Sequence, residues 1–304
     1  MKKYKILIVG GTGFIGFNLA KKCINKKWLV TCISKNKPKK NQKIKKVKYL
    51  QLNILNKKKL SQKLSARYHF IINLAGNKNI SKKSSVNLDY VGLKNIIEIF
   101  DKNRPNLFLQ IGSSAEYGKI NSPVKEEDLC RPISKYGKSK LKATNYLQNK
   151  IKKNNFPAAI LRLFQPYGPN QKKEMLVPFA INSCLKDEKF DCTIGTQKRD
   201  FLYIDDLINL FFLCFANKKI IGKTLNVGSG EQSSVKKIIN MIKEEIKLGK
   251  PIFGKKKIDK NEILDIYPKI DKLKNLLKWK PKTSLKAGLV KTIRSHINEF
   301  KIEK

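Results

Sequence analysis

Short apolar runs alternate with amphipathic stretches along the first half of the chain. The apolar runs are typical of buried strands in a parallel sheet and lie at residues 4–10, 28–34, 47–53, 69–76, 107–113 and 158–164. Helical patterns fill the intervals at about residues 14–26, 57–65, 85–102 and 134–153. This rhythm predicts an α/β fold in which helices cover both faces of a doubly wound parallel sheet of the Rossmann type.

The pattern becomes less regular after Phe164, where "QPYGPN" has turn chemistry and later segments mix helices with short strands. We therefore expect a sheet-containing domain in residues 1–165 and a smaller, mixed α/β substrate-binding lobe in residues 166–304. Residues 198–229 are expected to run back along the first domain.

Two apolar stretches could suggest a membrane or an export signal. The run at 207–216, "LINLFFLCFA", is about half the ~20 residues that a membrane span needs, so we expect a buried helix and no membrane span. The amino-terminal "MKKYKILIVGG" lacks both a long apolar core and a small-residue cleavage site. We expect a cytoplasmic protein.

The charge of the chain is extreme, with 66 Lys and Arg against 23 Asp and Glu, a formal net charge of +43. Such a charge raises nucleic acid and anionic membranes as partners. However, nearly all the basic residues are lysines spread along the whole chain, whereas phosphate and base recognition usually favours the bidentate guanidinium of arginine. We interpret the charge as a compositional bias that attracts anionic ligands, and expect no nucleic acid as primary partner.

The six cysteines have no C-x-x-C spacing, and the chain has only two histidines. Ligand clusters of the kind that zinc requires are missing from this pattern, so no metal site is expected. Reduced, buried cysteines in a cytoplasmic protein are the simpler interpretation.

A glycine-rich segment, "GGTGFIG", follows the first predicted strand and opens the first predicted helix. Gly10, Gly13 and Gly16 permit a tight turn, close approach of the backbone to a pyrophosphate, and close packing of helix on strand. The helix then offers free N–H groups and a positive dipole end to phosphates. Glycine turns are common, but this setting between two strands predicts a dinucleotide site.

The end of the second strand selects between coenzymes in such folds, because a carboxylate there binds the 2′-hydroxyl of NAD and basic residues accept the 2′-phosphate of NADP. Here the strand ends in Ser34 and Lys35, with no acid, and opens a run with seven lysines in residues 33–46. We therefore favour NADP(H) over NAD(H). The alternative is NAD bound beside a solvated loop, and from Lys37 onward we expect such a loop in either case.

A candidate catalytic set lies further along the chain. Tyr136 and Lys140 are four residues apart on a predicted helix and therefore share one face. Ser113 and Ser114 stand at the carboxyl end of a predicted strand, the edge at which open α/β sheets bind ligands. An ammonium close to a phenol favours the phenolate form, and a serine hydroxyl can hold a substrate oxygen.

With these residues the chain resembles the extended short-chain dehydrogenase/reductases that act on nucleotide sugars, over nearly its whole length. The motifs that carry the resemblance are "GGTGFIG", "NLAG" (73–76), "GSSAEYG" (112–118), "PISKYGKSK" (132–140), "RLFQPYGPNQ" (162–171), "RDFLYIDDL" (199–207), "LNVGSGEQSSV" (225–235) and "LKWKPKTSLKAGL" (277–289).

The resemblance implies an enzyme with a nicotinamide cofactor and a nucleotide-sugar substrate, and it also implies a homodimer. It assigns Ser113, rather than Ser114, as catalytic serine, Tyr136 as acid/base, and Lys140 to the nicotinamide ribose. The cofactor-binding residues it implies are Gly10, Gly13, Phe14, Ile15, Gly16, Ser34, Lys35, Asn53, Ile54, Leu74, Ala75, Tyr136 and Lys140, and the substrate-binding residues are Ser114, Gln165 and Arg199, of which Arg199 would contact the diphosphate.

The choice of reaction depends on departures from the family pattern. Family 4,6-dehydratases carry acids just after the catalytic serine, where this chain has Ser114 and Ala115, and Glu116 comes one position late. Epimerases commonly have acids at the ribose and adenine contacts, where this chain has Ser34 and Asn53. We expect reduction of C4 in an NDP-4-keto-6-deoxyhexose, with an NAD-dependent 4-epimerase as the alternative and a 4,6-dehydratase third.

Two departures concern the substrate: Gln165 replaces the usual Asn, and a second diphosphate-binding Arg has no clear counterpart, although Lys260 could substitute. A redox sensor or nucleic-acid-associated protein without turnover is an alternative of a different class. The intact set of Ser113, Tyr136 and Lys140 argues against it.

Overall fold

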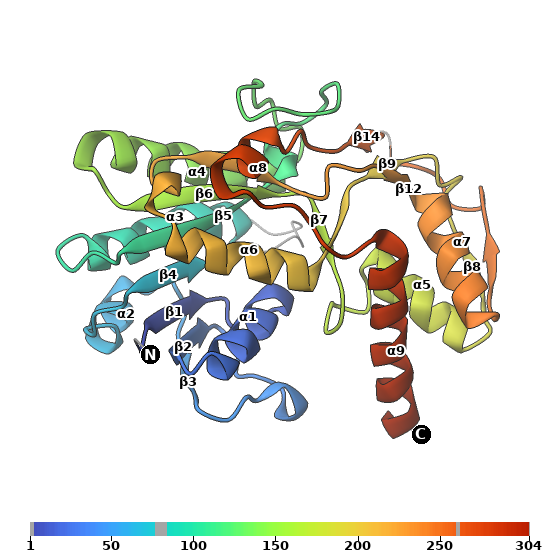
Figure 1. Ribbon diagram of the computed structural model, residues 1–304, viewed down its shortest axis with the longest axis horizontal. Helices are drawn as coiled ribbons and strands as arrows, with labels where there is room; N and C mark the ends of the chain where they lie inside the picture. Colours follow the sequence, from blue (N-terminus) through green and yellow to red (C-terminus); the bar gives the residue numbers. More distant parts are fainter. Residues whose placement is uncertain (1–2, 77–83, 260–261, 304) are drawn as a thin grey trace.

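A seven-stranded parallel sheet forms the centre of the larger lobe in the computed structural model, which describes residues 3–76, 84–259 and 262–303 (Figure 1). The strands lie in the order β11-β6-β5-β4-β1-β2-β3. Their bounds are β1 Lys5–Val9, β2 Leu29–Ser34, β3 Val47–Gln51, β4 Phe70–Asn73, β5 Leu107–Ser113, β6 Ala158–Leu163 and β11 Thr224–Val227. The strand order reverses between β1 and β4, which marks the edge where a doubly wound sheet binds its ligand.

Helices cover both faces of this sheet because β1 is apolar on both of its sides. Ile6 and Ile8 face the core shared with α1 and α6, whereas Leu7 and Val9 face the core shared with α3 and α4. The bounds are α1 Phe14–Asn25, α2 Lys57–Lys63, α3 Ser84–Phe100, α4 Lys135–Asn154 and α6 Ile204–Ala216. The predicted doubly wound α/β fold is confirmed.

The apolar run at residues 207–216 forms most of α6, a buried helix as expected. Within the described residues, no helix is both long and apolar enough to cross a membrane. β11 follows α6 and adds a strand to the edge of the main sheet beside β6, so this part of the chain runs back along the larger lobe.

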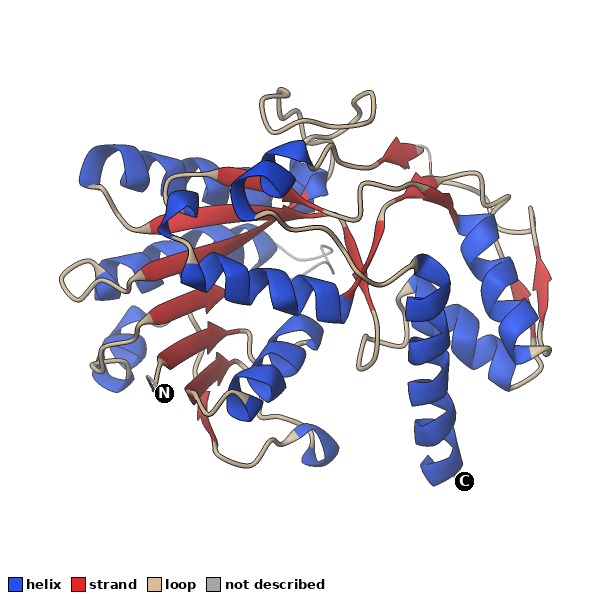
Figure 2. Ribbon diagram, in the orientation of Figure 1, coloured by secondary structure: helices blue, strands red, loops and turns tan. Residues whose placement is uncertain are grey.

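A smaller lobe stands beside the sheet, on the right of Figures 1 and 2. It contains α5 Leu176–Leu185, α7 Val235–Ile246, α9 Leu285–Glu303 and the parallel pair β8 Lys189–Asp191 and β13 Lys250–Ile252. The remaining elements are β7 Gln165–Tyr167, β9 Lys198–Arg199, β10 Phe201–Tyr203, β12 Ser233–Ser234, β14 Asp265–Ile266, α8 Asp271–Leu277 and the 3₁₀ turns η1 Lys40–Gln42, η2 Ser114–Glu116 and η3 Lys218–Ile220. β7 continues from β6 and pairs with β10, while β9 pairs with β12 and β14.

Candidate active site

The glycine-rich segment between β1 and α1 has the backbone geometry that a pyrophosphate site requires. Gly10 has φ +81°, and a Cβ there would lie 3.1 Å from the Ala75 nitrogen. A Cβ on Gly16 would lie 2.5 Å from the Gly10 carbonyl oxygen, so both glycines are sterically required. Among the described residues no side chain caps α1, whose first turn contains Phe14 and Ile15. The free amides at this end suit an anionic group, so the segment fits a dinucleotide.

A cavity of about 440 Å³ lies beside this segment, at the carboxyl end of β2. Ser34 lines it, and the Ser34 hydroxyl accepts a hydrogen bond of 3.2 Å from the Thr12 amide. Lys37 and Lys43 also line the cavity, whereas Lys35 is exposed and lies outside the lining.

This arrangement differs from the two sequence-based expectations for the lysine run. The chain bends directly after β2, so the basic side chains that reach the cavity come from further along the run than Lys35. The segment is not wholly a solvated loop either, because it contains η1 and forms one wall of the cavity. The described lining contains no carboxylate.

The other residues expected to contact the cofactor lie after β3 and β4. Asn53 is exposed, and its side-chain oxygen accepts a hydrogen bond of 3.0 Å from the Leu55 amide. Ile54 is buried in the core beneath α3, and its carbonyl accepts from the Asn95 side chain. Leu74 and Ala75 lie against the turn at Gly10. Leu74 and Ala75 therefore contact the phosphate-binding segment directly.

A cleft of about 430 Å³ between the sheet edge and the smaller lobe brings most of the other predicted residues together. Ser113 ends β5, and Tyr136 lies in the first turn of α4, which Ser134 caps by accepting from the Gly137 amide at 3.0 Å. The cleft is lined by Ser113, Ser114, Ala115, Ile133, Ser134, Tyr136, Phe164, Gln165, Arg199, Asp200, Glu262, Ile263 and Ile266.

Lys140 lies one turn after Tyr136 on α4, and its ammonium nitrogen is 5.9 Å from the centroid of the Tyr136 ring. The nitrogen pairs with Asp89 Oδ1 at 3.0 Å and donates to the carbonyls of Ile111 at 3.2 Å and Ala75 at 3.4 Å. Burial by itself lowers the pKa of this ammonium, but the negative charges of Tyr136 and Asp89 outweigh burial and raise it.

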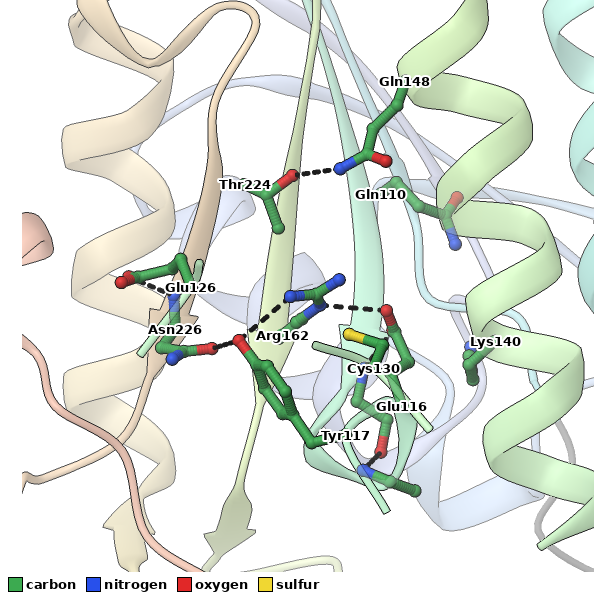
Figure 3. Close-up of polar contacts among 12 residues, drawn as sticks. Gln110, Glu116, Tyr117, Glu126, Cys130, Lys140, Gln148, Arg162, Thr224 and Asn226 are labelled. Carbon is green, nitrogen blue, oxygen red and sulfur yellow. Dashed lines mark hydrogen bonds and ion pairs between the residues drawn. The ribbon is translucent and has the colours of Figure 1, made fainter. Parts of the chain in front are cut away.

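A second buried ion pair joins Glu116 and Arg162 (Figure 3). Glu116 Oε1 accepts from the Ser113 amide at 2.8 Å, and Glu116 Oε2 accepts from Arg162 Nε at 2.9 Å. Arg162 also donates to the Tyr117 hydroxyl at 2.9 Å, which donates to Asn226 Oδ1 at 2.7 Å. Glu116 is fully buried and absent from the cleft lining, so this network fixes the backbone of Ser113 from behind.

Arg199 reaches the cleft already paired. Its guanidinium donates to Glu262 Oε1 at 2.6 Å and to the Leu264 carbonyl at 2.9 Å. Burial lowers the pKa of Arg199, and the charge of Glu262 offsets part of this effect. A diphosphate that binds Arg199 would therefore have to share its guanidinium with Glu262 or displace Glu262 from it. Lys260, the further cation suggested by the sequence, lies outside the described residues.

Sequence reasoning missed Asp89, although a signal was present. Asp89, Leu93, Ile96 and Phe100 follow helical spacing along α3 and are all buried, so one carboxylate lies within an apolar stripe. Such a residue points to a buried partner. Nothing in the local sequence identifies that partner, because Lys140 lies on a different helix.

The phosphate-binding segment, the cleft and the paired Lys140 together are typical of a dinucleotide-binding α/β protein of the short-chain type. The chain belongs to the NAD dependent epimerase/dehydratase family, whose model matches residues 6–228.

Among relatives, a Bacillus subtilis protein named uncharacterized UDP-glucose epimerase YtcB is 31% identical over 204 residues, which are 66% of this chain and 64% of YtcB. The chain thus spans slightly less than two thirds of that relative. The dTDP-4-dehydro-6-deoxyglucose reductase of Escherichia coli is 29% identical over 225 residues, or 70% of each chain.

Solved structures share the fold over almost the whole chain. The UDP-glucose 4-epimerase of Thermotoga maritima with UDP-glucose superposes with a TM-score of 0.92 at 22% identity, covering 97% of this chain and 99% of the other. The UDP-glucuronic acid 4-epimerase of Bacillus cereus, in complex with UDP-glucuronic acid and NAD, has a TM-score of 0.86 at 27% identity and the same coverage.

Proposed function

We propose that the protein reduces C4 of an NDP-4-keto-6-deoxyhexose with NADPH. The supporting observation is the cavity after β2, where Lys37 and Lys43 line a space without any carboxylate in the described lining. Basic groups at this position suit a 2′-phosphate. NADPH that exchanges with solvent supplies a net reductant, which a reductase needs and an epimerase does not.

The roles of the residues follow from their places in the cleft. When bound, the nicotinamide of NADPH would supply a hydride to the carbonyl carbon. Tyr136 would donate its phenolic proton to the carbonyl oxygen, which gives the alcohol, NADP⁺ and a Tyr136 phenolate that solvent reprotonates. Ser113 accepts a hydrogen bond from the Ala115 amide at 3.2 Å, which leaves its own hydroxyl proton for the substrate oxygen. Lys140 holds the nicotinamide ribose and favours the Tyr136 phenolate that remains.

The position of Glu116 weighs against the 4,6-dehydratase alternative. Elimination requires a carboxylate at the sugar, and Glu116 is buried behind Ser113 with both oxygens engaged. The equivalent places facing the cleft are held by Ser114 and Ala115, neither of which is an acid.

A nucleotide-sugar 4-epimerase with bound NAD is the second candidate. Its support is the Bacillus cereus UDP-glucuronic acid 4-epimerase, which shares 27% identity over 97% of this chain. The two candidates share Ser113, Tyr136 and Lys140 and differ in whether the coenzyme is consumed.

We assign residues 166–304, apart from the returning segment 198–229, as the substrate-binding lobe. Its contributions to the cleft include Glu262, Ile263 and Ile266, beside Arg199 of the returning segment and Gln165 at the domain boundary. A homodimer is proposed from the family resemblance, and sedimentation equilibrium at micromolar concentration would measure it.

The coenzyme preference is tested by titrating NADPH and NADH fluorescence against wild type, Lys37→Gln and Lys43→Gln. Each substitution should weaken NADPH binding by about threefold to tenfold and leave NADH binding unchanged, because only NADPH carries the 2′-phosphate. Lys39→Gln, an exposed lysine outside the cavity lining, is the matched control. Equal affinity of wild type for both coenzymes would count against a 2′-phosphate site.

The reaction is tested by incubating the protein and NADPH with a panel of nucleotide-linked 4-keto-6-deoxyhexoses and UDP-hexoses. We expect NADPH to be oxidised in a one-to-one ratio with a product that has gained two hydrogens, read by mass spectrometry. Isomerised product without consumption of NADPH would instead identify an epimerase.

A further inference from the structure

Lys140 is a buried cation whose charge is balanced from a neighbouring helix. The side chains of Lys140 and Asp89 are 4% and 0% exposed, and the Lys140 nitrogen lies 3.0 Å from Asp89 Oδ1. The other carboxylate oxygen of Asp89 accepts a hydrogen bond of 2.7 Å from Ser139. Asp89 therefore uses one oxygen for the ammonium, while its second oxygen is held by α4 itself.

The other elements around Lys140 contribute two carbonyl groups and two further titratable side chains, Glu116 and Tyr136. β5 and the segment after β4 contribute the carbonyls of Ile111 and Ala75. η2 contributes Glu116, but that carboxylate is already bound to Arg162 at 2.9 Å. α4 contributes the Tyr136 ring, at 5.9 Å from the nitrogen. Among the described residues, Asp89 is the one carboxylate within ion-pair distance of Lys140.

We propose that Asp89 is a positioning residue that keeps Lys140 as an ammonium, aimed at the nicotinamide ribose and Tyr136. The physical reason is the cost of burial: a buried lysine without a counter-charge loses its proton at a much lower pH than an exposed lysine. A neutral amine could neither stabilise a phenolate nor donate all its hydrogen bonds to ribose hydroxyls. Asp89 thus acts through Lys140 and contacts neither coenzyme nor sugar.

The proposal rests on the coenzyme role of Lys140 and is independent of which sugar reaction occurs. Its test accordingly uses coenzyme binding alone. NADPH and NADH, which share the nicotinamide ribose, are titrated by fluorescence at several pH values from about 5.5 to about 9.5. The proteins are wild type, Asp89→Asn, Lys140→Met and Asp101→Asn, whose surface carboxylate pairs with Arg104.

In Asp89→Asn, the dissociation constant should rise by about tenfold or more across this pH range, because Lys140 loses its proton within it. In wild type and Asp101→Asn it should change by less than about threefold. Lys140→Met should bind weakly at every pH without the pH dependence of Asp89→Asn. A merely structural defect would weaken binding equally at all pH values, so parallel pH profiles for wild type and Asp89→Asn would overturn the proposal.

If Asp89→Asn does not fold, the pH dependence of coenzyme binding by wild type and Lys140→Met alone tests whether Asp89 keeps Lys140 charged. The proposal expects level wild-type affinity up to about pH 9.5. A fall in wild-type affinity centred near about pH 7 to 8, absent in Lys140→Met, would mean that Asp89 does not hold Lys140 charged. A negative result in the sugar panel would leave this proposal standing, since the two experiments have different ligands.

Discussion

Each of the two buried ion pairs near the sheet edge joins a basic side chain to a carboxylate, but the surroundings of the pairs differ. Arg162 and Glu116 each bind further groups besides one another. Arg162 donates to the Tyr117 hydroxyl, and its Cζ atom lies 4.7 Å from the centroid of the Tyr117 ring, while Glu116 accepts from the Ser113 amide. Lys140 has one close carboxylate in Asp89, and its two carbonyl contacts are longer, at 3.2 and 3.4 Å.

The difference indicates that one buried ion pair can stabilise the fold while another supports binding and catalysis. Arg162 and Glu116 are absent from the described cleft lining and Glu116 binds the Ser113 amide, so this pair is suited to fixing the backbone. Lys140 can exchange its two carbonyl contacts for ribose hydroxyls while Asp89 keeps it charged. Mutations in the first pair should therefore reduce stability, and mutations around the second should reduce turnover or binding.

The largest effect is expected from Arg162→Met, which leaves the Glu116 carboxylate buried and unpaired. The free energy of unfolding should fall by about 3–5 kcal/mol, measured by urea denaturation. Lys57→Met, which breaks the exposed pair with Glu98, should cost less than about 1 kcal/mol.

The double variant Arg162→Met/Glu116→Gln tests the cause of that loss. Because it removes the stranded charge, it should recover part of the stability lost in Arg162→Met. If Arg162→Met were as stable as Lys57→Met, the pair would not be structural and the comparison would fail.

Tyr136→Phe tests the other side of the comparison. Turnover should fall by about 10² or more, because the phenolic proton is lost, while the free energy of unfolding should stay close to that of wild type. The matched control is Tyr146→Phe on the same helix, whose hydroxyl has no hydrogen-bond partner among the described residues. Full activity of Tyr136→Phe would contradict the role of Tyr136 as proton donor, and with it the chemical role of the neighbouring Lys140.

The smallest effect concerns His296 on α9, a buried base with no carboxylate partner among the described residues. Burial, with a smaller contribution from Lys173, lowers the pKa of His296 below its usual 6.5. The unfolded chain therefore binds a proton at a higher pH than the folded protein, so stability is full above about pH 7 and declines as the pH falls through about 6.5.

Replacing His296 with Gln should remove part of this decline, on the order of 1 kcal/mol, in urea denaturation compared between about pH 7 and pH 5. His69, the other histidine of the chain, is half exposed and provides the control substitution His69→Gln. If the pH dependence of the unfolding free energy were the same in His296→Gln as in wild type, burial would not disfavour protonation of His296. The same effect of burial is what Asp89 is proposed to offset at Lys140.

Much of the larger lobe could be predicted because its signals are local. Buried parallel strands consist of continuous apolar runs, and the six predicted runs contain β1 to β6. β11 has only four residues, so its own sequence carried little signal, and its place beside β6 depends on the packing of α6.

The candidate site divides in the same way. Ser113, Tyr136 and Lys140 belong to short motifs, and the glycines of residues 10–16 have a fixed spacing. Three carboxylates of the site pair with basic residues far away in the sequence, and only the fold determines these pairs: Asp89 with Lys140, Glu116 with Arg162, and Glu262 with Arg199. That Lys37 and Lys43 line the cavity after β2 is not visible in the sequence, because a sequence does not show where the chain bends after a strand.

The most direct test of the proposed function follows the hydride itself. NADPH deuterated at the transferable position of the nicotinamide is incubated with the protein and an NDP-4-keto-6-deoxyhexose, and the product is analysed by mass spectrometry and NMR. The account predicts one deuterium at C4 of the product sugar and one NADP⁺ for each product molecule. An isomerised sugar without deuterium, formed while NADPH stays intact, would contradict it.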